Sequence, residues 1–290
     1  MFSSQKIILA GNTLHYYQYS KPIEYDFTNA TKRYRQRPLE ADEAAETASG
    51  ADSHAYRARK SVRLLLQANG WQWLAEDKPI RPVFVTYTFK ECETSLKQAN
   101  RDFNKFTKRA NYEILGTKAA GLKWLTVPEF QKRGAVHYHT IYFNLRQQEF
   151  GKFAQVSLSL YQKLNRSWKQ GYLFIEQVDT LDHLTNYVSK YFTKTKNDRR
   201  FFGEKKYFTA RGLLQPKEFR DPGVVKTLLS ACDVPHYHKV FESNYISTLY
   251  QCYTLPESLK NYSLFEELSW ETLLSQGRQL TLPEPQQLTI

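Results

Sequence analysis

Two histidines separated by one residue, His137 and His139, are the first feature of this sequence that could do chemistry. Residues two apart on a strand point to the same face, so both imidazoles would lie near enough to share one ion. Imidazole is the commonest metal ligand in proteins. Residues 131–135 have the composition of a hairpin turn, which would bring the carboxylate of Glu129 opposite His137 on the neighbouring strand. Two imidazoles and a carboxylate, with the remaining positions open, suit a divalent cation that also holds substrate oxygens.

A second pair of histidines, His236 and His238, has the same spacing. It follows Pro235 in a stretch without strand periodicity, and it has no companion carboxylate of the kind that Glu129 provides. We therefore expect this pair to take no part in binding the metal.

Two tyrosines form the second chemical feature. Tyr187 and Tyr191 are four positions apart in a segment of helical periodicity, and Lys190 lies between them. At this spacing the two phenols and the ammonium share one face of a helix. A phenol with a pKa of about 10 is a poor nucleophile at neutral pH, but a nearby ammonium and a metal-bound phosphate favour the phenolate. The pair is a candidate for nucleophilic attack on phosphorus.

The elements that must position these residues alternate along the chain. Strands are predicted over 82–89, 122–130, 136–145, 172–178 and 206–210, and helices over 91–115, 150–169 and from about 179 to 194. Strand 136–145 is apolar on both faces, which places it in the middle of its sheet. The order β-α-β-β-α-β-α-β predicts a ferredoxin-like α+β fold, with an antiparallel sheet of about five strands covered by helices.

We expect three parts in the chain. Residues 1–52 contain a hairpin around Gly11, a basic cluster and an acidic linker. Residues 53–235 form the candidate catalytic domain, which begins with a helix over 53–69. Residues 236–290 form an acidic segment to which the sequence assigns no role.

Charge favours an anionic partner. The 290 residues include 41 Lys and Arg against 29 Asp and Glu, a net charge of +12, which points to nucleic acid, an acidic membrane or an acidic protein. From Phe241 onward acids outnumber bases, so the positive charge is concentrated in the earlier part.

Other patterns exclude several classes of protein. The three cysteines form no CxxC pair, which argues against a disulfide framework and a zinc ribbon. There is no apolar run of about 18 residues that would span a membrane, no signal peptide and no GxxxxGK[ST] motor loop. We expect a cytoplasmic protein.

Taken together, the segments resemble the HUH endonucleases, and within them the rolling-circle replication initiators of plasmids and single-stranded DNA phages. The resemblance covers about 81–216. Residues 83–89 look like the family's first, structural strand, 129–139 resemble its His-hydrophobe-His metal motif with an upstream acid, and 187–191 resemble its YxxK motif with the second tyrosine of the two-tyrosine class. Tyr138 is more polar than the aliphatic residue usual between the histidines.

The resemblance implies a reaction. Mg²⁺ or Mn²⁺ at the predicted metal site would polarise the scissile phosphate of single-stranded or supercoiled origin DNA, and Tyr187 would attack phosphorus. The products would be a 5′-phosphotyrosine and a free 3′-OH that a polymerase extends. Lys190 would neutralise the developing charge, and Tyr191 would take a second strand transfer when a round of copying ends. The cell would be a bacterial host, which would supply the helicase and the polymerase.

Basic residues outside the motifs would follow the DNA backbone. They are Arg57, Arg59, Lys60, Arg63, Lys194, Lys196, Arg199 and Arg200, with Lys105, Lys108, Arg109, Lys205 and Lys206 as further members of the set.

Two alternatives stay open. A conjugative relaxase or a single-strand transposase of the same superfamily would keep the fold and the chemistry but serve another process. A non-catalytic nucleic-acid-binding protein, such as an RNA-recognition module, would use aromatic platforms and no metal, and it would leave His137, His139 and Glu129 unexplained.

Overall fold

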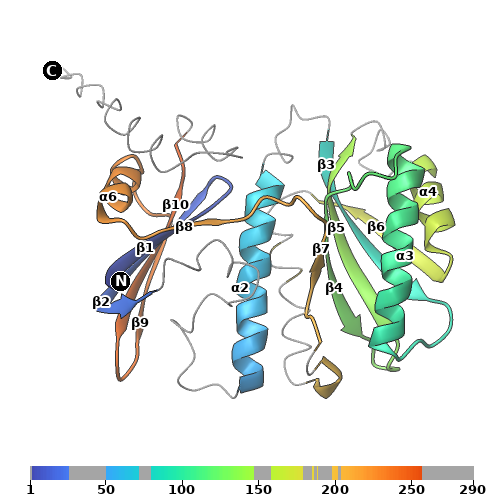
Figure 1. Cartoon of the computed structure of the whole chain (residues 1–290), viewed down its shortest axis with the longest axis horizontal. Helices are drawn as coiled ribbons and strands as arrows, with labels where there is room; N and C mark the ends of the chain where they lie inside the picture. The colour runs from blue at the N-terminus through green and yellow to red at the C-terminus, as the bar shows by residue number, and fades with distance from the viewer. Residues whose placement is uncertain are drawn as a thin grey trace. The chain divides into compact units, whose positions relative to one another are not determined.

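The computed structural model describes residues 2–25, 50–71, 80–146, 158–178, 185, 188, 198–201 and 204–256 (Figure 1). Internal contacts divide the chain into two units, one made of 1–28 with 217–290 and the other of 29–216. Each unit is described by itself. None of the described helices is both long and apolar enough to cross a membrane.

The unit of residues 29–216 is built on one antiparallel sheet. Its strands are β3 (Ile80–Phe89), β4 (Trp124–Phe130), β5 (Val136–Arg146), β6 (Gly171–Gln177) and β7 (Phe208–Thr209), in the spatial order β6-β3-β5-β4-β7. Helix α3 (Leu96–Leu115) connects β3 to β4, and α4 (Leu158–Trp168) lies between β5 and β6. This is the βαββαβ connectivity of a ferredoxin-like α+β fold, which confirms the predicted class. Strand β5 is the middle strand, as its two apolar faces indicated.

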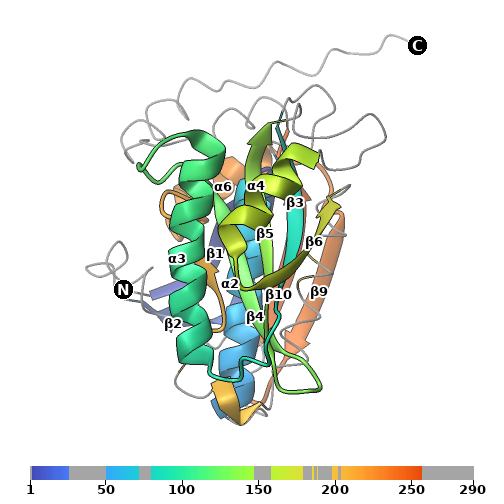
Figure 2. The same ribbon diagram turned by 90° about the vertical axis from the view of Figure 1, so that its right-hand side faces the viewer.

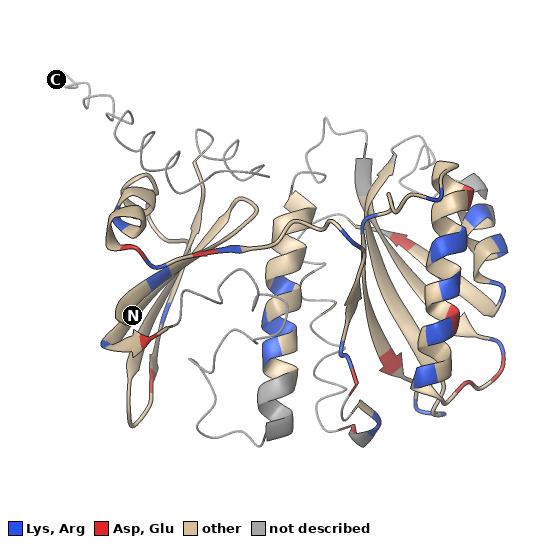
Figure 3. Cartoon of the chain, in the orientation of Figure 1, with Lys and Arg blue, Asp and Glu red and all other residues tan. Residues whose placement is uncertain are grey.

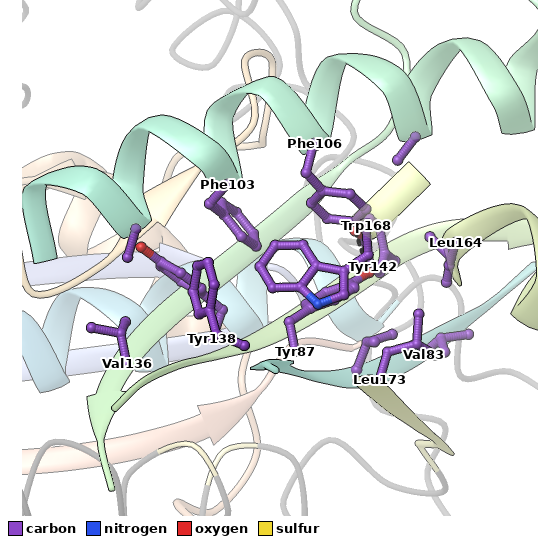
Figure 4. Close-up of a cluster of buried hydrophobic side chains, with 14 of the residues drawn as sticks. Val83, Tyr87, Phe103, Phe106, Val136, Tyr138, Tyr142, Leu164, Trp168 and Leu173 are labelled. Atoms are coloured by element: carbon purple, nitrogen blue, oxygen red, sulfur yellow. Dashed lines mark hydrogen bonds between the residues drawn. The ribbon is translucent and has the colours of Figure 1, made fainter. Parts of the chain in front are cut away.

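Helices α3 and α4 cover one face of this sheet (Figure 2). Aromatic rings fill the space between the helices and the sheet (Figure 4). The ring of Phe106 on α3 lies 4.6 Å from that of Tyr87 on β3, and Phe103 stacks on Tyr138 of β5 at 4.3 Å. Trp168, at the end of α4, is fully buried among them. These contacts fix the two helices to the sheet and leave its other face for a separate layer.

The opposite face of the sheet is covered by α2 (Gly50–Gly70), which corresponds to the helix predicted over 53–69. Its buried residues Val62, Leu65 and Leu66 pack in one cluster with the sheet residues Phe84, Leu125, Val127, Ile141 and Phe143. Val188 belongs to the same cluster.

Helix α3 begins five residues later than predicted. The hydroxyl of Ser95 accepts a hydrogen bond from the backbone N–H of Gln98, so Ser95 is the N-cap and the polar residues before it lie outside the helix. At the other end Gly116 has a φ of 70°, a left-handed conformation that glycine adopts easily. The side chain of Asn111 then hydrogen-bonds four backbone groups of the connection that leads to β4.

The other unit contains a second antiparallel sheet. Its strands are β1 (Phe2–Ala10), β2 (Thr13–Glu24), β8 (Lys217–Phe219), β9 (Tyr237–Glu242) and β10 (Ser247–Thr254), in the order β8-β1-β2-β10-β9. Strands β1 and β2 form the predicted hairpin, with Gly11 at a φ of 63° in its turn. Helix α6 (Pro222–Ser230) packs on one face of this sheet.

The two units begin and end at positions that differ from the expected three parts. Strand β10 pairs with β2, so residues after 235 belong with the N-terminal hairpin and do not form a separate segment. The boundary expected at 235 falls instead at 216 and 217. Pairing between strands so far apart in sequence leaves no local periodicity by which to recognise it.

Candidate active site

The β4–β5 hairpin positions the predicted metal ligands. The backbone N–H of Gly134 donates to the carbonyl of Gln131 at 2.8 Å, and the N–H of Gln131 donates to the carbonyl of Ala135 at 2.9 Å. Gly134 has a φ of 88°, which a residue with a Cβ adopts only under strain. This is the turn that the sequence predicts, and it sets Glu129 directly opposite His137.

All three predicted ligands lie on one face of the sheet. His137, His139 and Glu129 share the parity of Ile141, which packs on the side of α2, whereas Tyr138 points into the aromatic core beneath α3. Both histidines are buried, with exposed fractions of 7% and 6%.

His139 is held by two neighbours. Its Nε2 atom lies 2.8 Å from Oε2 of Glu129, and its Nδ1 atom lies 3.2 Å from the hydroxyl oxygen of Thr86 on β3. One tautomer satisfies both contacts: the Nε2–H donates to the carboxylate, and Nδ1 accepts from the threonine hydroxyl. The ring also stacks on Phe84 at 5.9 Å. Sequence reasoning missed Thr86, although the strand predicted over 82–89 gives it the parity of a residue on the histidine face.

His137 presents the opposite situation. Its Nε2 atom is buried and has no hydrogen-bond partner among the described residues. The pKa of His137 is lowered to about 4, first because burial disfavours the charged ring and then because of the charge of His139, while Glu129 acts in the other direction. The ring is therefore neutral at pH 7. A neutral imidazole nitrogen with no other partner is the form in which histidine binds a metal.

The residues fit a divalent cation. No three His, Cys, Asp or Glu side chains of the described ranges are already gathered around one point. Two of the predicted donors, however, are 2.8 Å apart, close to the spacing of about 2.9 Å between adjacent ligands of an octahedral Mg²⁺. The third, on His137, is the buried atom that lacks a partner. Nitrogen and carboxylate donors together suit Mn²⁺ or Mg²⁺.

The predicted nucleophile motif lies outside the described residues, and so do Tyr187, Lys190, Tyr191, Lys194 and Lys196. The described neighbours Thr185 and Val188 are both helical. Val188 is 1% exposed and belongs to the cluster on the histidine face of the sheet.

The basic residues of α2 divide by burial. Arg59 is exposed, and Arg57 and Arg63 are half-buried. Lys60, in contrast, is only 7% exposed, so it does not offer its ammonium to DNA as we expected from the sequence. Helix periodicity alone assigned it to the basic face; the tertiary packing buries it.

The remaining basic residues divide between ion pairs and open surface. Arg200 is exposed, pairs with Asp198 at 2.6 Å and lies over the ring of Phe130 at 3.9 Å. Arg109 instead donates from Nε to the carbonyl of Ser167 at 2.9 Å, which satisfies the end of α4. On α3 the exposed cations form a stripe that Figure 3 shows in blue, on the face of the sheet away from the histidines; they are Lys97, Arg101, Lys105 and Lys108. Arg199 is the first residue of a short 3₁₀ turn, η3 (Arg199–Phe201).

The second histidine pair lies in the other unit. His236 and His238 are both exposed. His238 lies in β9, where it pairs with Gln251, so the stretch that seemed to have no pattern is partly a strand. Its periodicity is weak because nearly all of its side chains are exposed.

Comparison with known families identifies one match. Residues 82–196 match the family model for the replication-associated protein ORF2. The matched segment is less than half of the chain, but it begins in β3 and includes the hairpin with its histidines and the segment 187–191. The match supports a family of rolling-circle replication initiators. No curated protein and no solved structure matches the chain significantly.

Proposed function

We propose that this chain is a rolling-circle replication initiator of the HUH type, which cuts one strand of origin DNA through a tyrosine and later rejoins strands. The observation that carries the proposal is the common placement of His137, His139 and Glu129 on one face of a ferredoxin-like sheet, inside the segment that matches replication-associated proteins. Initiators of this kind usually act as endonucleases.

In the proposed reaction the oxygen of Tyr187 attacks the scissile phosphorus. A P–O bond to tyrosine forms, the bond to the 3′ oxygen breaks, and that oxygen leaves as a 3′-OH after taking a proton. The phenol proton passes to solvent or to a nearby base. The phosphodiester is exchanged and not hydrolysed, so a later attack by a 3′-OH rejoins the strand without ATP.

The side chains of this unit have distinct tasks in the proposal. His137, His139 and Glu129 would hold Mg²⁺ or Mn²⁺, which when bound withdraws charge from the phosphate oxygens. Lys190 would stabilise the phenolate and the developing phosphate charge. The burial of Val188 on the histidine face supports this assignment, because Tyr187 is its immediate neighbour in the chain.

Covalent capture of DNA tests the proposal. The full chain is incubated with supercoiled plasmid carrying its own origin and with Mn²⁺, and the products are then treated with protease. Nicked circles with a peptide on the 5′ end support the proposal, and Tyr187→Phe should abolish them because it removes only the attacking oxygen. Binding of DNA without any nick or adduct would refute it, and would favour the non-catalytic alternative.

A further inference from the structure

An exposed pair of aromatic rings lies on the face of the sheet that carries the histidines. Tyr172 and Phe174 on β6 are 64% and 62% exposed. Rings of this size are normally buried, and neither makes an aromatic contact or a side-chain hydrogen bond within the part of the chain that the structure describes. Leu173, between them, packs into the core beneath α3 and α4. Strand alternation therefore directs both rings to the opposite face, where His137 and His139 lie.

The register of the sheet puts each ring in line with one histidine. Across β3, Tyr172 pairs with Thr88, which pairs with His137, and Phe174 pairs with Thr86, which pairs with His139. Two strand spacings separate each ring from its imidazole, roughly 10 Å. One or two nucleotides of an extended strand span such a distance.

Positive charge surrounds the end of this surface. Arg133, in the β4–β5 turn, reaches the carbonyl of Phe89 at the end of β3 with its Nη2 atom at 3.4 Å. The backbone of Lys90 donates to Gln170 just before β6, and Lys90 and Lys169 are both exposed. Exposed Glu91 is the acid next to them. Aromatic faces between cations are the composition of surfaces that bind single-stranded nucleic acid.

We infer that Tyr172 and Phe174 form a base-stacking platform for the nucleotides next to the cleaved phosphate. The inference rests on the proposed function, because it assigns these bases to the DNA strand held at the metal site. The rings would stack on unpaired bases, and the cations would contact the phosphates. A duplex keeps its bases stacked inside, so the platform would select a melted strand.

Strand β6 is also the edge of its sheet, and an exposed edge with aromatic rings is a place where a second copy of the chain can pair. We favour DNA because the two rings are in register with the two histidines and lie beside cations. A dimer is an alternative outcome of the test below.

The experiment measures binding of single-stranded DNA to the full chain carrying Tyr172→Ala and Phe174→Ala together. The matched control is Tyr112→Ala, because Tyr112 is 56% exposed but lies on α3, on the other face of the sheet. The probes are labelled oligothymidylate of about 20 nucleotides, which covers the site of a typical single-strand binder, and an abasic strand with the same phosphates.

We expect the double variant to bind oligothymidylate more weakly than the wild type by about 5- to 100-fold for each ring removed. The abasic strand should bind equally to both proteins, and the salt dependence should not change, since no phosphate contact is lost. Tyr172→Trp and Phe174→Tyr should restore binding. Equal affinity of the wild type and the double variant for oligothymidylate would overturn the inference, as would a dimer that becomes a monomer in the variant without loss of DNA binding.

The adduct assay separates the two proposals. If the double variant raises the KM for cleavage and leaves kcat unchanged, both the platform and the nuclease stand. If the wild type forms no adduct but loses DNA affinity with the two rings, the platform stands and the proposed nuclease fails. If the wild type forms adducts and the double variant does so with the same KM and affinity, the platform alone fails.

Discussion

The carboxylate of Glu129 contacts His139 at 2.8 Å, although the residue directly opposite Glu129 in the sheet is His137. The contact is diagonal, which the spacing of neighbouring strands permits for a side chain as long as glutamate. One imidazole is thereby paired and the other keeps its buried Nε2 atom without a partner among the described residues. This asymmetry is what makes the cluster a candidate for a third participant, a cation.

Removal of the carboxylate charge should weaken metal binding. Glu129→Gln keeps the shape of the side chain but removes a hard anionic ligand, so we expect the affinity for Mn²⁺ to fall by at least about 10-fold. The measurement is a titration of free Mn²⁺ by electron paramagnetic resonance. Glu176→Gln is the matched control, because Glu176 is an exposed carboxylate on the same face of β6. Unchanged Mn²⁺ affinity in both Glu129→Gln and His137→Ala would contradict the metal assignment.

The second pair of histidines should be dispensable. His236 and His238 are exposed and lie in the other unit, so replacing both by alanine should leave Mn²⁺ affinity and nicking within about twofold of the wild type, as expected of surface substitutions. Loss of nicking comparable with that of His137→Ala, in a protein that still folds, would show that this unit contributes to the reaction.

The two tyrosines should differ in their effects. Tyr187→Phe should abolish the covalent adduct on a single-stranded origin oligonucleotide, whereas Tyr191→Phe should leave the first adduct and impair only the second strand transfer. Gel analysis of denatured adducts before and after addition of an acceptor strand distinguishes the two steps. Loss of the first adduct in Tyr191→Phe alone would reverse the order, and full adduct formation by both variants would remove the preference for Tyr187.

The phenol of Tyr138 should matter for stability and not for metal binding. Its hydroxyl donates to Oδ1 of Asn100 at 2.6 Å from the face opposite the histidines. Tyr138→Phe leaves that oxygen without its donor, which should lower the free energy of unfolding by about 1–2 kcal/mol. Urea unfolding followed by circular dichroism measures the loss, with Tyr112→Phe at an exposed position as the control. An equal midpoint in the two variants would mean that the hydrogen bond contributes nothing net.

Alkaline pH should destabilise this unit through its buried tyrosines. Burial raises the pKa of Tyr87, Tyr138 and Tyr142 above the ordinary value, and the hydroxyls of Tyr87 and Tyr142 lie 3.0 Å apart. The unfolded chain ionises these phenols near pH 10 while the folded chain keeps them protonated, so the stability is fully present below about pH 10 and is lost as the pH rises further. Each such proton contributes about 1.4 kcal/mol per pH unit. Urea midpoints measured up to about pH 11 should therefore fall less steeply in Tyr87→Phe/Tyr142→Phe, and parallel curves would contradict this origin.

The amino-acid sequence alone determined the local features of the site. The period of two places His137 and His139 on one face because adjacent strand residues alternate, whatever the rest of the chain does. The turn containing Gly134 sets the register that brings Glu129 opposite His137. The alternation of strands and helices was sufficient to predict the ferredoxin-like class, and the apolar faces of β5 were sufficient to place it in the middle.

Tertiary structure decided what depends on partners distant in sequence. The choice of His139 over His137 by Glu129 follows from side-chain packing against Thr86 and Phe84 on a third strand. Lys60 was predicted to be on a solvated face and is buried, since helix periodicity does not report what packs on a helix. The joining of β10 to the N-terminal hairpin and the exposure of Phe174 at a sheet edge are likewise set by strand order. Strand order arises from the burial of the whole sheet, a property that no short segment of sequence contains.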